Sequence, residues 1–232
     1  MIHLHLQECE STQEEVLKRI SKRHDEQILI STERQSLGRG RRGNQWIFYP
    51  GSLAFSFTLE APSPIQLASL EIGLLFCRYV DEKIKLKWPN DLMFEGKKCG
   101  GILCQLAGDR VIVGMGLNIF QETARISSKN DNSGFGPGWL PWKEEGLQKN
   151  WPLRFYRFVL KSRLHSSSIL AEFPQYCDHM GRSVSIHSGE NEKGEGVIEG
   201  IFQGIGPNGE GVIASDPGKE PHRVLSGSLF YN

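Results

Sequence analysis

The sequence predicts an α/β protein of the α+β type, in which helices pack on a mixed or antiparallel sheet and a small all-β barrel follows. Three observations lead to this fold class. Short apolar runs of strand length recur between turn residues up to Asn118. Longer segments with helical apolar spacing lie among them. From about Gly181 the pattern changes to short strands alone, which fits a small barrel. We therefore expect two domains, residues 1–180 and 181–232.

The first part of the chain predicts strands around one helix and one long loop. Residues 1–6 alternate as a strand does, and a serine with glutamate three residues later forms a capping box for a helix over about 12–24. A short apolar run over 27–31 predicts the next strand. Residues 34–45 are too rich in glycine and charge to pack, so we expect a solvated loop there. Strand character returns over 52–59.

The middle of the chain predicts the rest of the sheet. The apolar pattern over 65–80 is long enough for a buried helix, and residues 84–88 alternate as a strand. Turn residues at 95–96 and 108–109 then separate three further strand-like runs that end at Asn118. Such closely spaced strands predict antiparallel pairing with the helix packed on the sheet.

The remaining third is less regular. Residues 121–150 carry Ser, Asn, Gly and Pro without periodicity, which predicts a loop-rich insertion. Asn150 and Pro152 suit the cap and first turn of a helix. In the C-terminal domain, residues 188–194 and 207–209 are the expected turns between short strands.

Composition limits the class of protein. The chain has 232 residues, with 27 Lys and Arg against 27 Asp and Glu, so no global positive charge favours nucleic acid. No apolar stretch approaches the roughly 20 residues that a bilayer requires, and the N-terminus lacks the features of a signal peptide. Five scattered cysteines with no C-x-x-C pair predict reduced thiols. We expect a cytoplasmic protein that binds neither membrane nor DNA.

The glycine and arginine run over 38–43 is the first candidate for chemistry. It satisfies the dinucleotide pattern G-x-G-x-x-G, but no helical face follows, and no Gly-Lys-Ser/Thr closes it as a Walker loop. Three arginines within four positions repel one another, so they favour a phosphate or carboxylate ligand. A solvated basic turn is the structural alternative. An RNA- or DNA-binding loop is the other, supported by the nearby Trp46 but opposed by the neutral chain.

A Lys-Trp-Pro-Asn-Asp run over 87–91 is the second candidate. Proline removes a ladder donor and turns the chain, which holds the polar groups at a fixed place. Asp91 could orient Mg²⁺, because this hard ion prefers oxygen ligands shared with nucleotide phosphates, and Asn90 and Lys87 could bind a triphosphate. An ordinary turn would use Asn and Asp equally well.

Two strand segments contain unusual glycines. In 97–103, two lysines give way to paired glycines within an apolar run, and 114–118 places glycines at alternate positions before an asparagine. Glycine inside a strand weakens it unless a backbone or ligand must come close. We therefore expect a ligand on the sheet, with a β-bulge as the alternative.

Together these segments resemble the biotin protein ligase family, whose hallmarks are a G-R-G-R-R-G loop followed by tryptophan, a K-W-P-N-D run, a K-x-x-G-I-L segment and a G-x-G-x-N strand. All four occur here in the family order. The resemblance implies a catalytic domain related to class II synthetases, followed by an SH3-like barrel. Only ten residues precede Ser11, too few for the DNA-binding module of some members, so a monofunctional enzyme is expected.

The resemblance also implies roles for particular residues. Arg39 and Lys98 are expected to be catalytic. The expected biotin contacts are Ser11, Thr12, Gln35, Gly38, Arg39, Arg41, Lys98, Gly101, Gly114 and Gly116. The expected nucleotide contacts are Arg41, Arg42, Trp46, Asn90 and Asn118, and Asp91 is the expected metal or triphosphate organiser. Without the resemblance, Trp46 would be read as a core residue and Lys98 as a solvated hairpin lysine.

The implied activity uses ATP and Mg²⁺ to activate biotin, and it transfers biotin to a lysine of a biotin carboxyl carrier protein. A lipoate or octanoate ligase or transferase shares the catalytic fold and is the enzymatic alternative. The arginine loop followed by Trp46 favours biotin chemistry. A basic-loop nucleic-acid-binding module without catalysis is the alternative from another class, and salt-dependent binding to random oligonucleotides would support it.

Overall fold

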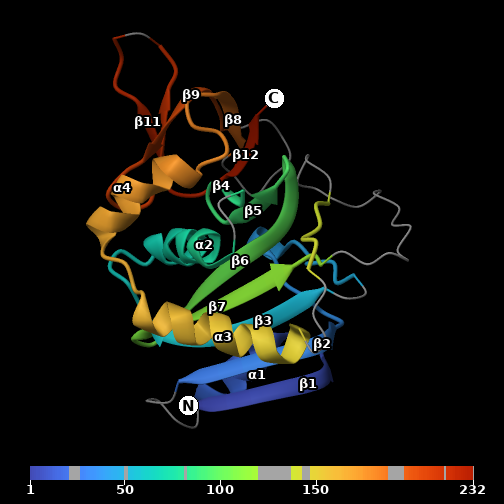
Figure 1. The fold of residues 1–232 in the computed structure, drawn as a ribbon. Coiled ribbons are helices and arrows are strands. Elements are labelled where there is room, and N and C mark those ends of the chain that lie inside the picture. Colours follow the sequence, from blue (N-terminus) through green and yellow to red (C-terminus); the bar gives the residue numbers. More distant parts are fainter. Residues whose placement is uncertain are drawn as a thin grey trace.

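A computed structural model describes residues 1–20, 27–49, 52–80, 83–119, 137–142, 147–187, 196–216 and 218–231 (Figure 1). Seven strands form a mixed sheet in the order β1-β2-β3-β7-β6-β5-β4, and five form a C-terminal sheet in the order β11-β10-β9-β8-β12. The mixed α/β class and the small C-terminal β unit are thus as predicted. No helix in the described part of the chain is long and apolar enough to span a membrane.

The N-terminal part of the large sheet is parallel, so the sheet is of the mixed kind that the predicted fold class allowed. β1 (Ile2–Cys9) pairs in parallel with β2 (Ile28–Gln35), and α1 (Thr12–Ile20) crosses between them. A parallel pair needs such a crossover, whereas an apolar pattern by itself carries no strand direction. Residues 21–24 of the predicted helix lie outside the described residues. β2 continues beyond the predicted end, which brings Gln35 into strand structure.

The rest of the large sheet is antiparallel, as predicted. Its strands are β3 (Leu53–Glu60), β4 (Lys85–Lys87), β5 (Asp91–Phe94), β6 (Lys97–Ala107) and β7 (Arg110–Leu117). Glycines at the predicted turns have positive φ, 72° at Gly96 and 66° at Gly108, which glycine adopts without steric cost.

Helices cover both faces of this sheet. α2 (Leu67–Val80) and α3 (Leu147–Lys161) pack over the main core, and α1 packs over a small separate core on the other face (Figure 1). The alternation of β2 separates them, because Leu29 belongs to the main core and its two neighbours to the small one. The predicted loop 121–150 is largely outside the described residues.

The start of α3 corrects one prediction. The helix begins at Leu147, so Asn150 is not its cap and Pro152 lies inside it rather than in its first turn. The physical reason is burial, because Leu147 and Trp151 are 4% and 6% exposed and pack against the main core. Packing against the core therefore starts the helix several residues before the position that asparagine and proline indicate.

The C-terminal part begins with α4 (Ser166–Tyr176), which was not predicted and packs between α2 and β9 (Figure 1). The small sheet consists of β8 (Ser183–His187), β9 (Val197–Ile205), β10 (Gly211–Ala214), β11 (His222–Val224) and β12 (Ser228–Tyr231). The turn at 207–209 joins β9 and β10 as predicted, and the loop 188–194 lies outside the described residues. Among the described strands β11 and β12 are edges, so the pairing does not form a closed barrel.

Buried contacts join the two sheets. Trp88, which follows β4, is fully buried, and its indole Nε1 donates to the carbonyl of Gly209 in the β9–β10 turn at 3.0 Å. The C-terminal sheet is therefore held against the end of the large sheet at which the polar motifs lie.

Candidate functional site

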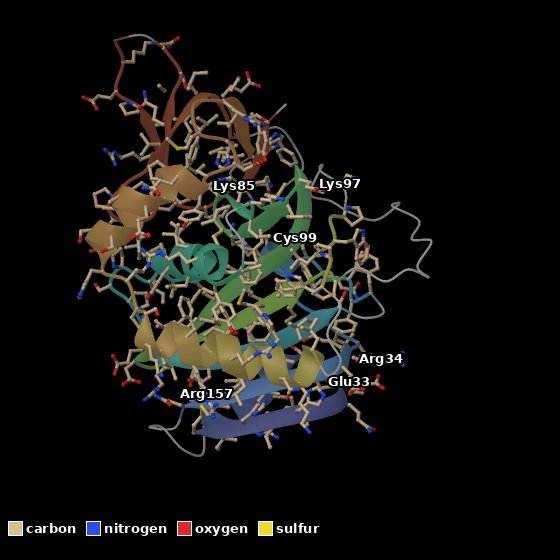
Figure 2. The ribbon with its side chains drawn as sticks, in the orientation of Figure 1. Glu33, Arg34, Lys85, Lys97, Cys99 and Arg157 are labelled. Carbon is tan, nitrogen blue, oxygen red and sulfur yellow. The ribbon has the colours of Figure 1, made fainter. Side chains whose placement is uncertain are left out.

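A cleft of about 1230 Å³ brings the sequence motifs together. It lies between the strands of the large sheet, the 3₁₀ turn η1 (Arg41–Gly43) and the start of β12. Glu33 and Arg34, labelled in Figure 2, mark the end of β2 at its rim. The predicted site residues that line it are Ser11, Thr12, Gln35, Arg39, Arg41, Arg42, Trp46, Asn90, Asp91, Lys98, Gly101, Gly114, Gly116 and Asn118.

Gly38 is the exception, because it packs behind the lining. Its carbonyl accepts the Trp46 backbone N–H at 2.9 Å. A Cβ at Gly38 would lie 2.7 Å from both the Gln35 side chain and the Trp46 carbonyl, closer than side chains tolerate. Gly38 therefore shapes the loop and allows Gln35 and Trp46 to approach each other.

A polar pocket forms where α1 begins. The backbone N–H of Thr12 donates to Oε1 of Gln35 at 2.9 Å, and the Thr12 hydroxyl lies 2.8 Å from that of Ser56. Thr12 is 4% exposed, and Ser56 is fully buried. Because Gln35 accepts the first N–H of the helix, its amide orientation is set, and its Nε2 donors remain for other partners. The pocket is thus a fixed set of small hydrogen-bonding groups.

The glycines of β6 and β7 form a floor that the Trp46 indole covers. A Cβ at Gly116 would lie 2.3 Å from Trp46 Cε2, and one at Gly101 would lie 3.3 Å from Trp46 Cζ3. The two glycines pair across the strands, so they present one flat surface. The ring is only half-buried, and its Nε1 has no hydrogen-bond partner. Trp46 is therefore a cleft wall and not a core residue.

Gly114 serves the polar pocket instead. A Cβ there would lie 3.0 Å from Oε1 of Gln13 and 3.4 Å from the hydroxyl of Ser56, which pairs with Gly114 across β3 and β7. Bare backbone at this position leaves room for both side chains. The three predicted glycines thus divide between the indole and the polar pocket.

Lysines on two strands meet one carboxylate beside the floor. Asp91 Oδ1 lies 2.8 Å from Lys98 Nζ, and Asp91 Oδ2 lies 3.1 Å from Lys87 Nζ. Figure 2 labels Lys97 and Cys99, the neighbours of Lys98 on β6. Burial alone would raise the pKa of Asp91, but the two ammonium groups outweigh it and hold the pKa below its ordinary value. The group carries a net positive charge into the cleft.

This arrangement does not fit Asp91 as a metal ligand. Both carboxylate oxygens already face an ammonium group, and a divalent cation placed there would be repelled by two like charges. Among the residues that the structure describes, no group of three or more His, Cys, Asp or Glu side chains could hold a metal ion.

Two asparagines also line the cleft. Asn90 Nδ2 donates to the carbonyl of Ile102 at 2.9 Å, which fixes its side chain. Asn118 is 5% exposed, and its Nδ2 lies 3.4 Å from the carbonyl of Lys98. Its Oδ1 has no partner although it is buried, which is costly unless a ligand supplies a donor. Asn118 is therefore the clearer candidate for a ligand contact.

The three arginines of the loop contact residues that lie far apart in the sequence, and two of them share one partner. Arg39 pairs with Glu14 of α1 at 2.5 Å. Arg41 donates to Asn90 Oδ1 at 3.3 Å and to the Ser226 hydroxyl at 3.2 Å. Arg42 donates to the same hydroxyl at 3.3 Å and to the carbonyl of His187. The loop is thus held between α1, Asn90 and the C-terminal unit.

Sequence reasoning missed two polar residues of the pocket and left one segment unassigned. Gln13 is 6% exposed, lines the cleft, and its Nε2 has no partner; its place directly after Ser11 and Thr12 was the available signal. Ser56 lies within an apolar strand, where no local pattern marks it. The segment 227–230 also lines the cleft, although no role was assigned to it.

Comparison with known proteins places this cleft in a family. Residues 6–118 match the Biotin/lipoate A/B protein ligase family. The chain is 27% identical over 228 residues to the Bifunctional ligase/repressor BirA of Escherichia coli (strain K12), covering 89% of this chain and 67% of that protein. It is 38% identical over 104 residues to Biotin--protein ligase 1, chloroplastic, of Arabidopsis thaliana, covering 38% of this chain and 28% of that protein.

The fold agrees with a solved structure of the same kind. The biotin protein ligase from Aquifex aeolicus in complex with biotin and ATP superposes with a TM-score of 0.74 at 24% identity, covering all of this chain and 99% of that one. The matched residues 6–118 contain every predicted site residue of this chain. These residues therefore form a domain that matches the biotin/lipoate A/B protein ligase family.

Proposed function

We propose that this protein activates biotin with ATP to biotinyl-5′-AMP and transfers the biotin to a lysine of a biotin carboxyl carrier protein. One observation carries the proposal. A single cleft joins a pocket of fixed hydrogen-bonding groups, a cluster of cations and an aromatic wall beside a buried unpaired asparagine. The relatives named as biotin ligases and the similar enzyme bound to biotin and ATP support it.

The polar pocket suits the ring system of biotin. A ureido group needs both donors and acceptors at fixed positions, and Ser11, Thr12 and Gln35 supply them with Gln13 beside them. The acid chain would run along the bare backbone of Gly114 towards the lysines. Its carboxylate would then meet Lys98 and Arg39, which favour an anion.

The nucleotide would occupy the half of the cleft lined by Trp46 and the two asparagines. The indole offers a flat apolar face for adenine, and the unpaired Oδ1 of Asn118 can accept from an amino or hydroxyl group. Arg41 and Arg42 would close over the phosphates, because their contacts to Ser226 and His187 already place them across the opening.

The reaction has two balanced steps. A biotin carboxylate oxygen attacks the α-phosphorus of ATP, and the bond from that phosphorus to the bridging oxygen breaks, releasing pyrophosphate. Lys98 and Arg39 stabilise the charge that develops on the phosphoryl oxygens. The carrier lysine amine then attacks the acyl carbon, AMP leaves with the bonding electrons, and the amine loses a proton. The protein positions both pairs of reactants.

ATP is expected as its Mg²⁺ complex, since that ion screens triphosphate charge and is commonly held by the phosphates themselves. Because Asp91 does not fit as its ligand, no step is assigned to the ion. We also propose that the C-terminal unit begins at residue 181, since its first strand starts at Ser183, and that its strands form an open SH3-like barrel with edges at β11 and β12. The five free cysteines support a reducing compartment such as the cytoplasm.

The proposal is tested by supplying MgATP with biotin, lipoate or octanoate and measuring pyrophosphate release. We expect release with biotin and co-purification of biotinyl-adenylate by mass spectrometry. Lys98→Ala should reduce release by roughly 100- to 1000-fold while leaving the fold intact, the loss typical of one preorganised charge. Release with lipoate or octanoate alone would assign the chain to the other branch of the family. Release with none of the acids would reject ligase activity.

A further inference from the structure

We propose that Asp91 is a positioning residue that holds Lys87 and Lys98 as a preorganised pair of cations at the wall of the cleft. This inference rests on the proposed function for its kinetic consequence only. It replaces the expected metal role of Asp91 with an electrostatic one. The three residues lie on three adjacent strands, and the pairing of these strands places their side chains together.

The row across the strands is the first support. Lys87 on β4 and Asp91 on β5 are directly paired in register, so their side chains share one face of the sheet. Asp91 is also paired with Gly101 on β6, whose missing side chain leaves space beside the carboxylate. The side chain of Lys98, which is also on β6, reaches this space.

A β-bulge supplies that lysine. The register between β5 and β6 shifts between Leu92 and Met93, so Met93 pairs with Lys98 rather than with Cys99. Met93 lies two residues from Asp91 and therefore on the same face. Without the extra residue, Cys99 would occupy that face and Lys98 would point to the other side. The bulge thus aims Lys98 at Asp91, a common use of bulges beside active sites.

Burial is the second support. The Lys87 side chain is 6% exposed and that of Asp91 is 12% exposed, whereas that of Lys98 is 24% exposed and lies over the Trp46 ring. Two ammonium groups so close together would repel and separate if no anion lay between them. One carboxylate oxygen for each lysine removes that repulsion and sets both positions. Lys98 remains the more open of the two and can meet a ligand.

The energetic consequence differs from that of a metal ligand. If Asp91 is replaced by Asn, Lys98 loses its anchor and Lys87 becomes a buried cation without this carboxylate partner. Catalysis should fall because Lys98 is misplaced at the developing charge, and not because Mg²⁺ binds more weakly. A metal ligand would give the opposite pattern, with the loss restored by excess Mg²⁺.

The chain offers a matched control in another buried ion pair. Glu71 is 1% exposed and accepts from Arg163 at 2.7 Å, but it lies outside the cleft lining. Glu71→Gln removes a buried carboxylate charge of the same kind without touching the lysines. It should lower thermal stability and leave kcat within about twofold of the native value, since Glu71 makes no hydrogen bond or ion pair with either lysine and substitutions without shared partners act independently.

The experiment compares native protein, Asp91→Asn, Lys87→Met and Glu71→Gln. Pyrophosphate release with biotin and ATP is measured over a range of Mg²⁺ concentrations, and thermal unfolding reports whether each variant folds. In parallel, each protein is treated without ligands with an amine-acylating ester at fixed pH, and mass spectrometry measures the labelling rate of Lys98. The labelling requires no enzymatic activity.

We expect kcat to fall about 10- to 100-fold in Asp91→Asn at every Mg²⁺ concentration, and by less in Lys87→Met, which keeps the Asp91–Lys98 pair. Labelling of Lys98 should rise severalfold in Asp91→Asn and stay near native in Glu71→Gln. If the native protein is inactive with biotin but Lys98 is labelled faster in Asp91→Asn than in the native protein, the positioning role is supported and the proposed function is rejected. Native kcat with unchanged labelling in Asp91→Asn, or activity restored by excess Mg²⁺, would overturn the positioning role.

Discussion

Gly116→Ala should displace the Trp46 indole and weaken nucleotide binding without unfolding the protein. The added Cβ would lie 2.3, 2.6 and 2.7 Å from Cε2, Cζ2 and Nε1 of the indole. Favourable contacts between such atoms lie at about 3.5–4.0 Å, so the ring must withdraw by roughly 1 Å or more. Trp46 stands on a loop and is half-buried, so the ring can yield while the strands keep their register.

The magnitude follows from the closeness of this contact. Forcing a group into a packed site costs about 1–3 kcal/mol. Here that cost weakens the packing of the loop that carries Trp46 against the sheet. If adenine packs on the same ring, the KM for ATP should rise by about 5- to 150-fold, because each 1.4 kcal/mol is a factor of ten. Gly101→Ala, with its Cβ at 3.3 Å from the ring, should have a smaller effect of the same kind.

Pyrophosphate release as a function of ATP concentration measures the effect, and thermal unfolding measures the fold. Gly114→Ala is the matched control on the same strand, because its Cβ would contact Gln13 and Ser56 and not the indole. It should change the KM for biotin and leave that for ATP near native. In a Trp46→Ala background, Gly116→Ala should have little further effect on the KM for ATP. Additive effects of the two substitutions would refute the assignment of the clash to Trp46.

Three further outcomes are expected. Biotin with ATP should raise the melting temperature and slow trypsin cleavage within residues 34–45, since an anionic ligand orders a self-repelling loop; unchanged cleavage would count against this. Arg41→Gly loses the contacts to Asn90 and Ser226, so the adenylate should dissociate about 10- to 100-fold faster and label bystander albumin, as a chase with cold ligand and a biotin blot would show. Burial, together with the charges of Lys87 and Arg182, lowers the pKa of His179 from 6.5 to about 3. Between these two pH values the unfolded chain therefore binds a proton at this histidine that the native protein does not bind. Stability should therefore fall by roughly 1 kcal/mol for each pH unit as the pH is lowered from 6.5 towards 3, and urea titrations should show a smaller fall in His179→Gln.

Much of the site could be predicted because its chemistry is local in sequence. Glycines at alternate strand positions and a loop of three arginines can be recognised from short stretches of sequence, and both line the same cleft. Antiparallel strands separated by glycine turns were legible for the same reason, since their pairing follows the chain order. The helix α4 was missed because its place depends on α2 and β9, which lie far away in sequence.

Tertiary structure alone decided which partners the polar groups have. The sequence by itself indicated the fold class and the unusual glycines on two strands, and the family resemblance implied that Lys98 and Asp91 share one site. It could not show that Asp91 meets two lysines, because that depends on cross-strand pairing and on a one-residue bulge at Leu92 and Met93. Side chains alternate between the faces of a strand, so a single register shift exchanges which residue shares the carboxylate's face. The role of Asp91 is therefore set by strand register and not by residue type.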